Sequence, residues 1–196
     1  LIFSLLYLCY PALNFVNYFE FHPVSFVIFF LLWMFYYFEN GNFLLYIAFM
    51  VLSLLCKENV AVGIVSFGIY IGIFRKKSLK WAIAPILIGS IYLIIVLKIM
   101  SLLNKGVMNF AFLYSNFGDS FKEIVVNVLT KPSITIKALF SGINLDFLVK
   151  LFLPLVFFSL FSKVIFIALP FFLQQMLSAR LTDHSINYHY TAALIP

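Results

Sequence analysis

Charge is the scarcest property of this sequence. Of its 196 residues only 10% are charged, whereas 64% are hydrophobic and 20% are aromatic, and the mean hydropathy is +1.09. Soluble globular domains carry charge on about a quarter of their residues, so this composition lies far outside their range. The scarcity of charge therefore excludes a soluble enzyme and predicts a multi-pass protein of the cell membrane.

Several signatures of soluble catalysis are also missing. The sequence has no phosphate-cradling glycine loop, no Ser-His-Asp arrangement in a readable order and no basic repeat for nucleic acid. Both cysteines, Cys9 and Cys56, lie in apolar runs, where a free thiol behaves as a small hydrophobe. We therefore expect no disulfide, no nucleophilic cysteine and no nucleic-acid partner. We interpret the net charge of +6 as reflecting contact with lipid headgroups.

Long apolar runs make up most of the chain. A spanning helix needs about 20 mostly apolar residues, whereas the strands of a membrane barrel would alternate apolar with polar residues, which these runs do not. We predict an all-α transmembrane helix bundle that forms a single domain over residues 1–196, with about six full spans and partial spans at both ends. The predicted spans are 1–13, 23–38, 43–56, 60–74, 81–100, 147–161 and 164–177, with a further span from Tyr190.

Both ends of the sequence lie within apolar segments. The chain does not begin with methionine, it ends in "HYTAALIP", and its first run has neither a basic region nor a small-residue cleavage site. We therefore expect a fragment of a longer protein, with further spans upstream of Leu1.

One long connection, residues 101–143, is predicted to lie outside the membrane. In "SFKE", Ser120 takes the N-cap position and Glu123 the third helical position of a capping box. We expect a short helix that ends before Pro132 and lies in the membrane interface. A second short helix is predicted over residues 133–142.

The basic residues predict an orientation. "RKKSLK", residues 75–80, places four basic residues in one short loop, which the positive-inside rule assigns to the cytoplasm. The turns "ENGN" (39–42) and "FSK" (161–163) then fall on the same side. The opposite side collects four polar segments: "YFEFHP" (18–23), "CKEN" (56–59), "NFGDS" (116–120) and "DHSINYHY" (183–190).

Lys57 and Glu58 stand between two apolar runs without a glycine or proline beside them. A charged side chain at the bilayer centre costs about 2.5–3.5 kcal/mol on insertion scales, so the pair is expected at a helix junction. One interpretation is a polar hairpin tip with a snorkelling Lys57. The other is a site in which Lys57 binds an anionic group and Glu58 orients it or handles a proton.

The histidines have two readings as well. His22 and His189 lie at predicted span boundaries, either as interfacial hydrogen-bonding residues or as groups that bind phosphate or a proton. Glu20 with His22, and Asp183 with His184, could form a divalent-cation site with His189. No spacing matches a zinc or EF-hand signature, so no metal site is assigned and a divalent cation stays an alternative.

Four blocks of the sequence occur in an order typical of one family: "FEFHP", "CKENVAVGIVSFGIYIGIFRKK", "FGDSFKEI" and "NYHYTAALIP". Together they resemble a family of predicted polytopic membrane proteins of unknown function that is grouped with the GT-C glycosyltransferases. The resemblance covers nearly the whole chain. This sequence departs from the family pattern at Glu20, Val24 and Asn59, and the missing acids at the last two positions argue against a carboxylate-rich metal site.

The resemblance implies a transferase that takes a sugar from a polyprenyl-phosphate carrier at the non-cytoplasmic membrane face. An acidic residue in a first external loop, upstream of Leu1, would activate the acceptor or hold a metal ion. Preorganised cations would stabilise the departing lipid phosphate, and Tyr190 would belong to an aromatic belt or stack on substrate. The candidate catalytic residues are Glu58 and Glu20, and the candidate substrate-binding residues are Lys57, His22, Arg180, His189 and Tyr190.

Two other classes stay open at this point. A transporter would also place ionisable residues inside a helix bundle, but it favours inverted repeats, and this sequence shows none. A membrane scaffold without chemistry is the other alternative. The sugar, the acceptor and the oligomeric state are not predicted.

Overall fold

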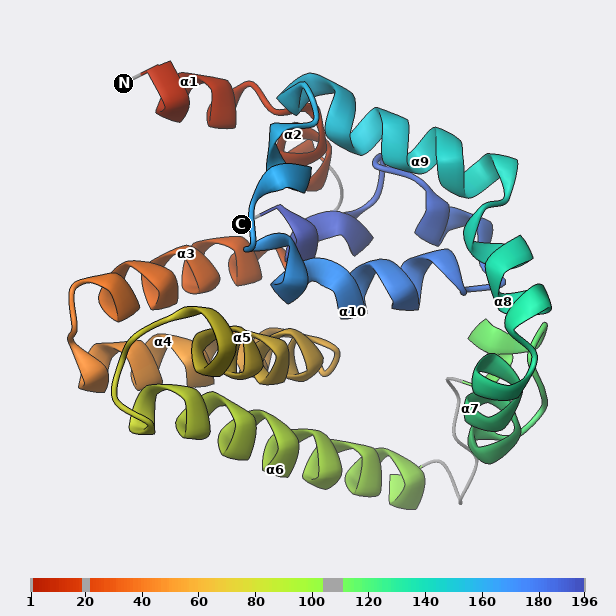
Figure 1. The fold of residues 1–196 in the computed structure, drawn as a ribbon, viewed down its shortest axis with the longest axis horizontal. Helices are drawn as coiled ribbons and strands as arrows, with labels where there is room; N and C mark the ends of the chain where they lie inside the picture. Colours follow the sequence, from red (N-terminus) through yellow and green to blue (C-terminus); the bar gives the residue numbers. More distant parts are fainter. Residues whose placement is uncertain (1, 19–21, 104–110, 196) are drawn as a thin grey trace.

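The computed structural model describes residues 2–18, 22–103 and 111–195, which form helices and turns and contain no strand (Figure 1). The predicted all-α class is therefore confirmed. The α-helices are α1 (Ile2–Leu8), α2 (Pro11–Tyr18), α3 (Ser25–Glu39), α4 (Phe43–Cys56), α5 (Val60–Phe74), α6 (Lys80–Leu103), α7 (Phe121–Thr130), α8 (Pro132–Leu139), α9 (Gly142–Phe152) and α10 (Ile165–Met176). Short 3-10 turns are η1 (Ala111–Tyr114), η2 (Leu153–Leu155), η3 (Phe158–Phe161), η4 (Leu181–His184) and η5 (His189–Leu194).

Five of the predicted apolar runs are single helices. The bounds of α3, α4, α5, α6 and α10 agree with the predicted spans within three residues at each end. Polar turn residues set these limits. Gly41 adopts a positive φ of 73° between α3 and α4, and the Asn42 side chain accepts a hydrogen bond from the Leu45 N–H (3.2 Å) at the start of α4.

Three predicted spans differ from the structure. Residues 1–13 form two helices, because Pro11 starts a new helix and restricts the backbone before it. Residues 147–161 are not one helix either: α9 ends at Phe152, Pro154 lacks an N–H donor, and Val156 and Phe157 adopt positive φ angles. The segment from Tyr190 lies in the 3-10 turn η5.

The number of membrane spans is a separate matter from the number of helices. Within the described residues, α6 alone is long and apolar enough to cross a bilayer, and α8 with residues 142–155 forms a bent pair at 48° that would count as a second span. Helices α3, α4, α5 and α10 are apolar but have only 12 to 15 residues. The count of six spans thus stays a prediction.

Aromatic packing joins helices α3 to α6 into one core. The Phe38 ring lies 5.2 Å from the Phe67 ring and 5.6 Å from the Trp81 ring, and Tyr46 lies 5.2 Å from Trp81, all measured between ring centroids. These four side chains come from four different helices and are all buried. Helix α10 packs on α5 and also contacts η5, so the C-terminal segment is attached to the same core (Figure 1).

Glycine allows α5 and α6 to approach closely. A Cβ atom on Gly68 would lie 2.7 Å from the carbonyl oxygen of Ala82, and one on Gly89 would lie 3.0 Å from that of Ala61. Small residues at such positions are typical of helix contacts in membranes, where close backbone approach replaces hydrophobic driving force.

The connection at 101–143 contains the two predicted short helices. Ser120 caps α7 by accepting the Glu123 N–H (3.3 Å), while the Glu123 carboxylate accepts the N–H of Asp119 (3.1 Å), one residue before the cap. The second helix begins at Pro132 and ends at Leu139, three residues before the predicted limit. The interfacial location of both helices stays a prediction.

We predict that Gly68→Ala destabilises the protein by about 1–3 kcal/mol, because the added methyl group would clash with the backbone of α6. Gly72→Ala is the matched control in α5, since its Cβ would meet only the Ala82 Cβ at 3.8 Å. Thermal unfolding in detergent would measure both variants. An unfolding temperature for Gly68→Ala at or above that of Gly72→Ala would contradict close packing of these helices.

Candidate functional site

Lys57 lies in the short turn between α4 and α5. The turn is closed by backbone hydrogen bonds from the Val60 N–H to the Lys57 carbonyl oxygen (3.2 Å) and from Ala61 to Glu58 (3.3 Å). The Lys57 Nζ atom lies 5.1 Å from the centre of the Tyr190 ring, within the range of a cation–π contact. Burial lowers the pKa of Lys57, while the neighbouring Glu58 opposes this shift.

Arg180 contacts the same aromatic ring. Its guanidinium carbon lies 4.2 Å from the Tyr190 ring centre, and its Nε and Nη2 atoms donate to Oδ1 of Asp183 at 3.0 and 2.6 Å. The other oxygen of this buried carboxylate accepts a hydrogen bond from the Ser178 hydroxyl at 2.7 Å. The carboxylate thus fixes the guanidinium and leaves part of its N–H fork unused by Asp183.

Two histidines complete the cluster. The rings of His22 and His189 are stacked with centroids 4.0 Å apart, and His189 lies 4.3 Å from the ring of Tyr190. Burial of His189, together with the positive charge of its neighbours His22, Lys57 and Arg180, lowers its pKa to about 4. His189 is therefore neutral near pH 7.

The structure thus brings five of the seven candidate site residues together around one tyrosine ring. We call this group the Tyr190 cluster; it consists of Lys57, Arg180, His22, His189 and Tyr190. Glu58 is half-buried beside Lys57 in sequence, and its charge acts on the Lys57 ammonium. Glu20, the second candidate carboxylate, lies outside the described residues.

Helix α10 and the segment just after it contact the Tyr190 cluster through Gln175 and Ser178, which the sequence analysis did not predict as site residues. The Gln175 side chain donates from Nε2 to the carbonyl oxygen of Tyr190 at 3.0 Å, which fixes the backbone beneath the ring. Ser178, just beyond α10, holds Asp183. Gln175 is a polar residue inside the apolar run 164–177, and this position could have marked it as a candidate site residue. Nothing in the spacing of the sequence linked it to Tyr190.

A buried hydrogen-bond network connects α9, α10 and η4. The Asn144 amide donates from Nδ2 to the carbonyl oxygens of Ala138 and Met176, each at 2.8 Å, which leaves Oδ1 as an acceptor. His184 faces this oxygen with Nδ1 (2.5 Å) and the Ser178 carbonyl with Nε2 (2.8 Å). Both ring nitrogens of His184 therefore lie within hydrogen-bond distance of an oxygen atom.

His184 therefore has a structural explanation within the described residues. Those residues contain no group of three or more His, Cys, Asp or Glu side chains placed to hold one metal ion. The predicted ligand Glu20 lies outside them, so the divalent-cation alternative stays untested.

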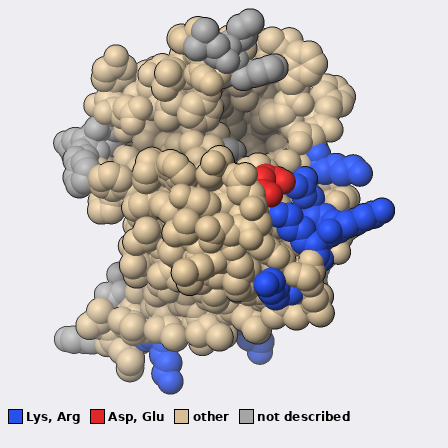
Figure 2. All heavy atoms as spheres, turned by 90° about the vertical axis from the view of Figure 1, so that its left-hand side faces the viewer, with Lys and Arg blue, Asp and Glu red and all other residues tan. Residues whose placement is uncertain are grey.

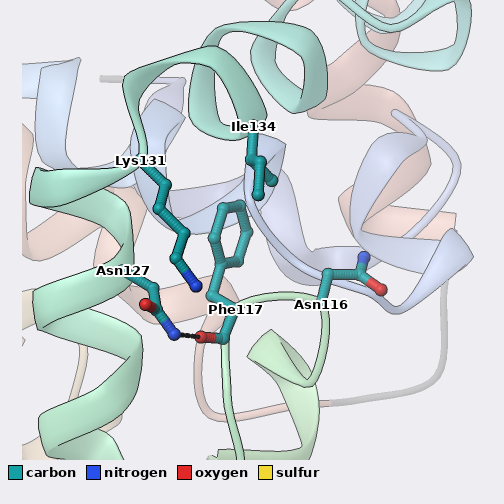
Figure 3. A pocket seen from close by; sticks show the side chains of 5 residues that line it. All are labelled: Asn116, Phe117, Asn127, Lys131 and Ile134. Atoms are coloured by element: carbon teal, nitrogen blue, oxygen red, sulfur yellow. Dashed lines mark hydrogen bonds between the residues drawn. The ribbon is translucent and has the colours of Figure 1, made fainter.

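The segment 116–120 reaches the C-terminal end of α10 without joining the cluster. Phe117 packs with Ile124 and Leu177, and the Tyr114 hydroxyl donates to the Gln174 carbonyl oxygen at 3.3 Å. Asn116 and Phe117 instead line a small cavity of about 30 Å³ with Asn127, Lys131 and Ile134 (Figure 3). This volume suits one or two water molecules and is too small for a sugar.

The outer surface is apolar over most of the helices. Ile83, Leu87, Ile91, Ile94 and Ile95 of α6 are all exposed, as lipid-facing residues would be. An apolar helix bundle with such a surface is typical of a helical membrane protein.

The chain belongs to the DUF2079 family, described as predicted membrane proteins, whose family model matches residues 1–196. Comparison with curated proteins and with solved structures finds no match. Membership confirms the resemblance to a family of predicted membrane proteins and supports the membrane location. The grouping with the GT-C glycosyltransferases and the multi-pass topology stay predictions, and the description of the family states no activity.

We predict that Asn144→Ala destabilises the protein by about 1–3 kcal/mol, because it removes the amide that donates to the carbonyl oxygens of Ala138 and Met176 and the oxygen that His184 faces in a buried position. Asn116→Ala, at an exposed position, should change the free energy of unfolding by less than about 0.5 kcal/mol. Thermal unfolding in detergent would compare them, and equal effects would contradict a supporting role for the network.

We also predict an acid-sensitive contribution from His189. Its folded pKa of about 4 lies below the ordinary value of 6.5, so protons favour the unfolded state. Its contribution is complete above pH 6.5 and is lost as the pH falls through about 4.

The measurement compares unfolding of the parent and of His189→Gln in detergent between pH 4 and 7.5. The parent should lose more stability on acidification than the variant. Parallel pH profiles for the two proteins would show that His189 does not titrate in this window.

Proposed function

We propose that this protein is a multi-pass, GT-C-like glycosyltransferase, which transfers a sugar from a polyprenyl-phosphate carrier at the non-cytoplasmic membrane face. The observation that carries the proposal is the pair of cations on the Tyr190 ring. Arg180 has a carboxylate partner, whereas no hydrogen-bond acceptor or ion-pair partner contacts the Lys57 ammonium among the residues that the structure describes.

A phosphate would supply the missing partner of Lys57. Burial disfavours the charged form of a lysine, and a bound anion would restore that form, so binding gains free energy from Lys57 in particular. Lys57, Arg180, Asp183 and Glu58 sum to a formal charge of zero. The phosphate would therefore be held by directed, charge-assisted hydrogen bonds and not by a large net charge.

The neighbouring side chains suit the remaining parts of the donor. Tyr190 and the stacked pair of His22 and His189 offer ring faces and polar edges beside the two cations. Aromatic faces are common contacts for sugar-sized substrates with apolar and polar sides. The exposed apolar residues of the helices provide a surface for the polyprenyl chain.

In the proposed reaction an acceptor hydroxyl oxygen attacks the anomeric carbon of the donor. The bond between that carbon and the phosphate oxygen breaks, the electron pair leaves with polyprenyl phosphate, and the hydroxyl proton passes to a carboxylate. Lys57 and Arg180 would stabilise the charge that develops on the departing phosphate. Glu58, with Glu20, would position these cations or accept the proton.

The orientation follows from the charge distribution. Helix α5 connects Lys57 to the basic loop 75–80, and its 15 residues span about 22 Å. The Tyr190 cluster and the basic loop thus lie at opposite ends of this helix. With the basic loop in the cytoplasm, the cluster faces the other side of the membrane.

The test uses full-length protein reconstituted in lipid and labelled polyprenyl-phosphate sugars as donors. Lys57→Ala should reduce transfer or release of sugar by about 10- to 100-fold, the value of a charge-assisted hydrogen bond. Lys122→Ala, an exposed lysine of α7, is the control and should retain activity.

Equal activity of the two variants would show that Lys57 does not bind the donor phosphate and is a snorkelling lysine at a hairpin tip. Absence of turnover with every donor, in a protein shown to be folded, would instead favour a transporter or a scaffold.

A further inference from the structure

Basic side chains gather at the end of the molecule opposite the Tyr190 cluster. Figure 2 shows Lys and Arg crowded at one edge of the face, with an acidic residue beside them. We call this group the basic end; it comprises Arg75, Lys76, Lys77 and Lys80 of the α5–α6 loop region, Lys163 before α10, and Glu39 at the end of α3. Its five cations and one carboxylate leave a formal charge of +4.

Contacts with the core fix part of the basic end. Arg75 pairs with the Glu39 carboxylate, and the Lys77 ammonium donates to the Phe38 carbonyl oxygen at the C-terminal end of α3. Lys77 also lies 4.8 Å from the Trp81 ring centre. These contacts hold the loop against the α3–α4 turn and place its charges on a fixed surface.

The other cations lie over aromatic rings at the rim. The Lys80 Nζ atom is 4.9 Å from the Phe43 ring centre, and the Lys163 Nζ atom is 5.5 Å from that of Phe74. Lys76 lies four residues before Lys80 and is exposed. None of these three lysines has an ion-pair partner among the described residues, so their charge is available to an anion.

Large apolar side chains lie beside these cations. Ile73, Leu79 and Phe161, which lie within two residues of a basic side chain in the sequence, are 67%, 70% and 87% exposed. Leu44, which follows the Phe43 ring that Lys80 contacts, is 79% exposed. A surface that alternates cations with protruding apolar side chains matches the boundary between lipid phosphates and acyl chains. A soluble anion or an acidic peptide would use the charge but would leave the apolar groups in water.

We propose that the basic end is a binding site for anionic phospholipid headgroups of the surrounding bilayer. Lys76, Lys80 and Lys163 contact the phosphates, while the flanking leucine, isoleucine and phenylalanine side chains enter the acyl region. The site is separate from the Tyr190 cluster and does not depend on the proposed transferase activity. It would anchor the α3–α4 and α5–α6 connections at one membrane surface.

The test is native mass spectrometry of the purified full-length protein with added phosphatidylglycerol or phosphatidylcholine. The parent should bind phosphatidylglycerol more tightly, and added salt should reduce this preference. Lys76→Gln/Lys80→Gln should weaken phosphatidylglycerol binding about 25-fold, because each basic residue near an anionic surface contributes about fivefold. Lys122→Gln/Lys137→Gln removes the same charge from exposed positions of α7 and α8 and should bind as the parent does.

Three results would overturn the proposal. The first is equal binding of phosphatidylglycerol and phosphatidylcholine by the parent. The second is an equal loss of phosphatidylglycerol binding in the two double variants. The third is that inorganic phosphate displaces bound phosphatidylglycerol as well as added phosphatidylglycerol does. The first and third measurements use the parent alone, so they stand even if a variant fails to fold. Sugar transfer is not part of the readout, so failure here leaves the proposed function untouched.

Discussion

The desolvation cost of charge is the constraint on which this structure depends. With so few ionisable residues in an apolar bundle, almost every one must lie at a helix end, contact an aromatic ring or pair with an opposite charge. The α4–α5 hairpin separates two such regions: the basic end at one side and Lys57 at the other. In both regions the cations lie over aromatic rings. These rings are Phe38, Phe43 and Trp81 at the basic end and Tyr190 beside Lys57.

The Tyr190 cluster combines a rigid frame with a lysine that has no acceptor among the residues that the structure describes. Asp183 and Ser178 hold Arg180, Gln175 holds the Tyr190 backbone, and the Asn144 network fixes the segment that carries them. A scaffold protein would need only the rigid part of this arrangement. The half-buried Lys57 ammonium lies beside the same ring without an acceptor among the described residues, and this favours an anionic ligand as the explanation.

Hydrophobic runs bounded by polar turns predicted most helices correctly, because local sequence decides where an apolar helix can end. The same reasoning failed where the backbone breaks inside an apolar run: no polar residue marks the left-handed angles at Val156 and Phe157. For the cluster, alternating topology predicted that His22, Lys57 and the segment 183–190 lie together, as they do, but it also placed 116–120 with them, and this segment lies elsewhere. The partners of individual side chains, such as Gln175 with Tyr190 or Asn144 with His184, depend on tertiary packing that periodicity does not encode.

The most direct test of a phosphate site at Tyr190 measures the binding of two lipids to full-length protein in a bilayer. One is a polyprenyl phosphate and the other is the matching uncharged polyprenol, and each carries a photoreactive group at its polar end. The phosphate should bind at least about tenfold more tightly, and its cross-links should fall within residues 56–59 and 178–190. Equal affinities for the two lipids, or cross-links confined to the basic end, would contradict the account.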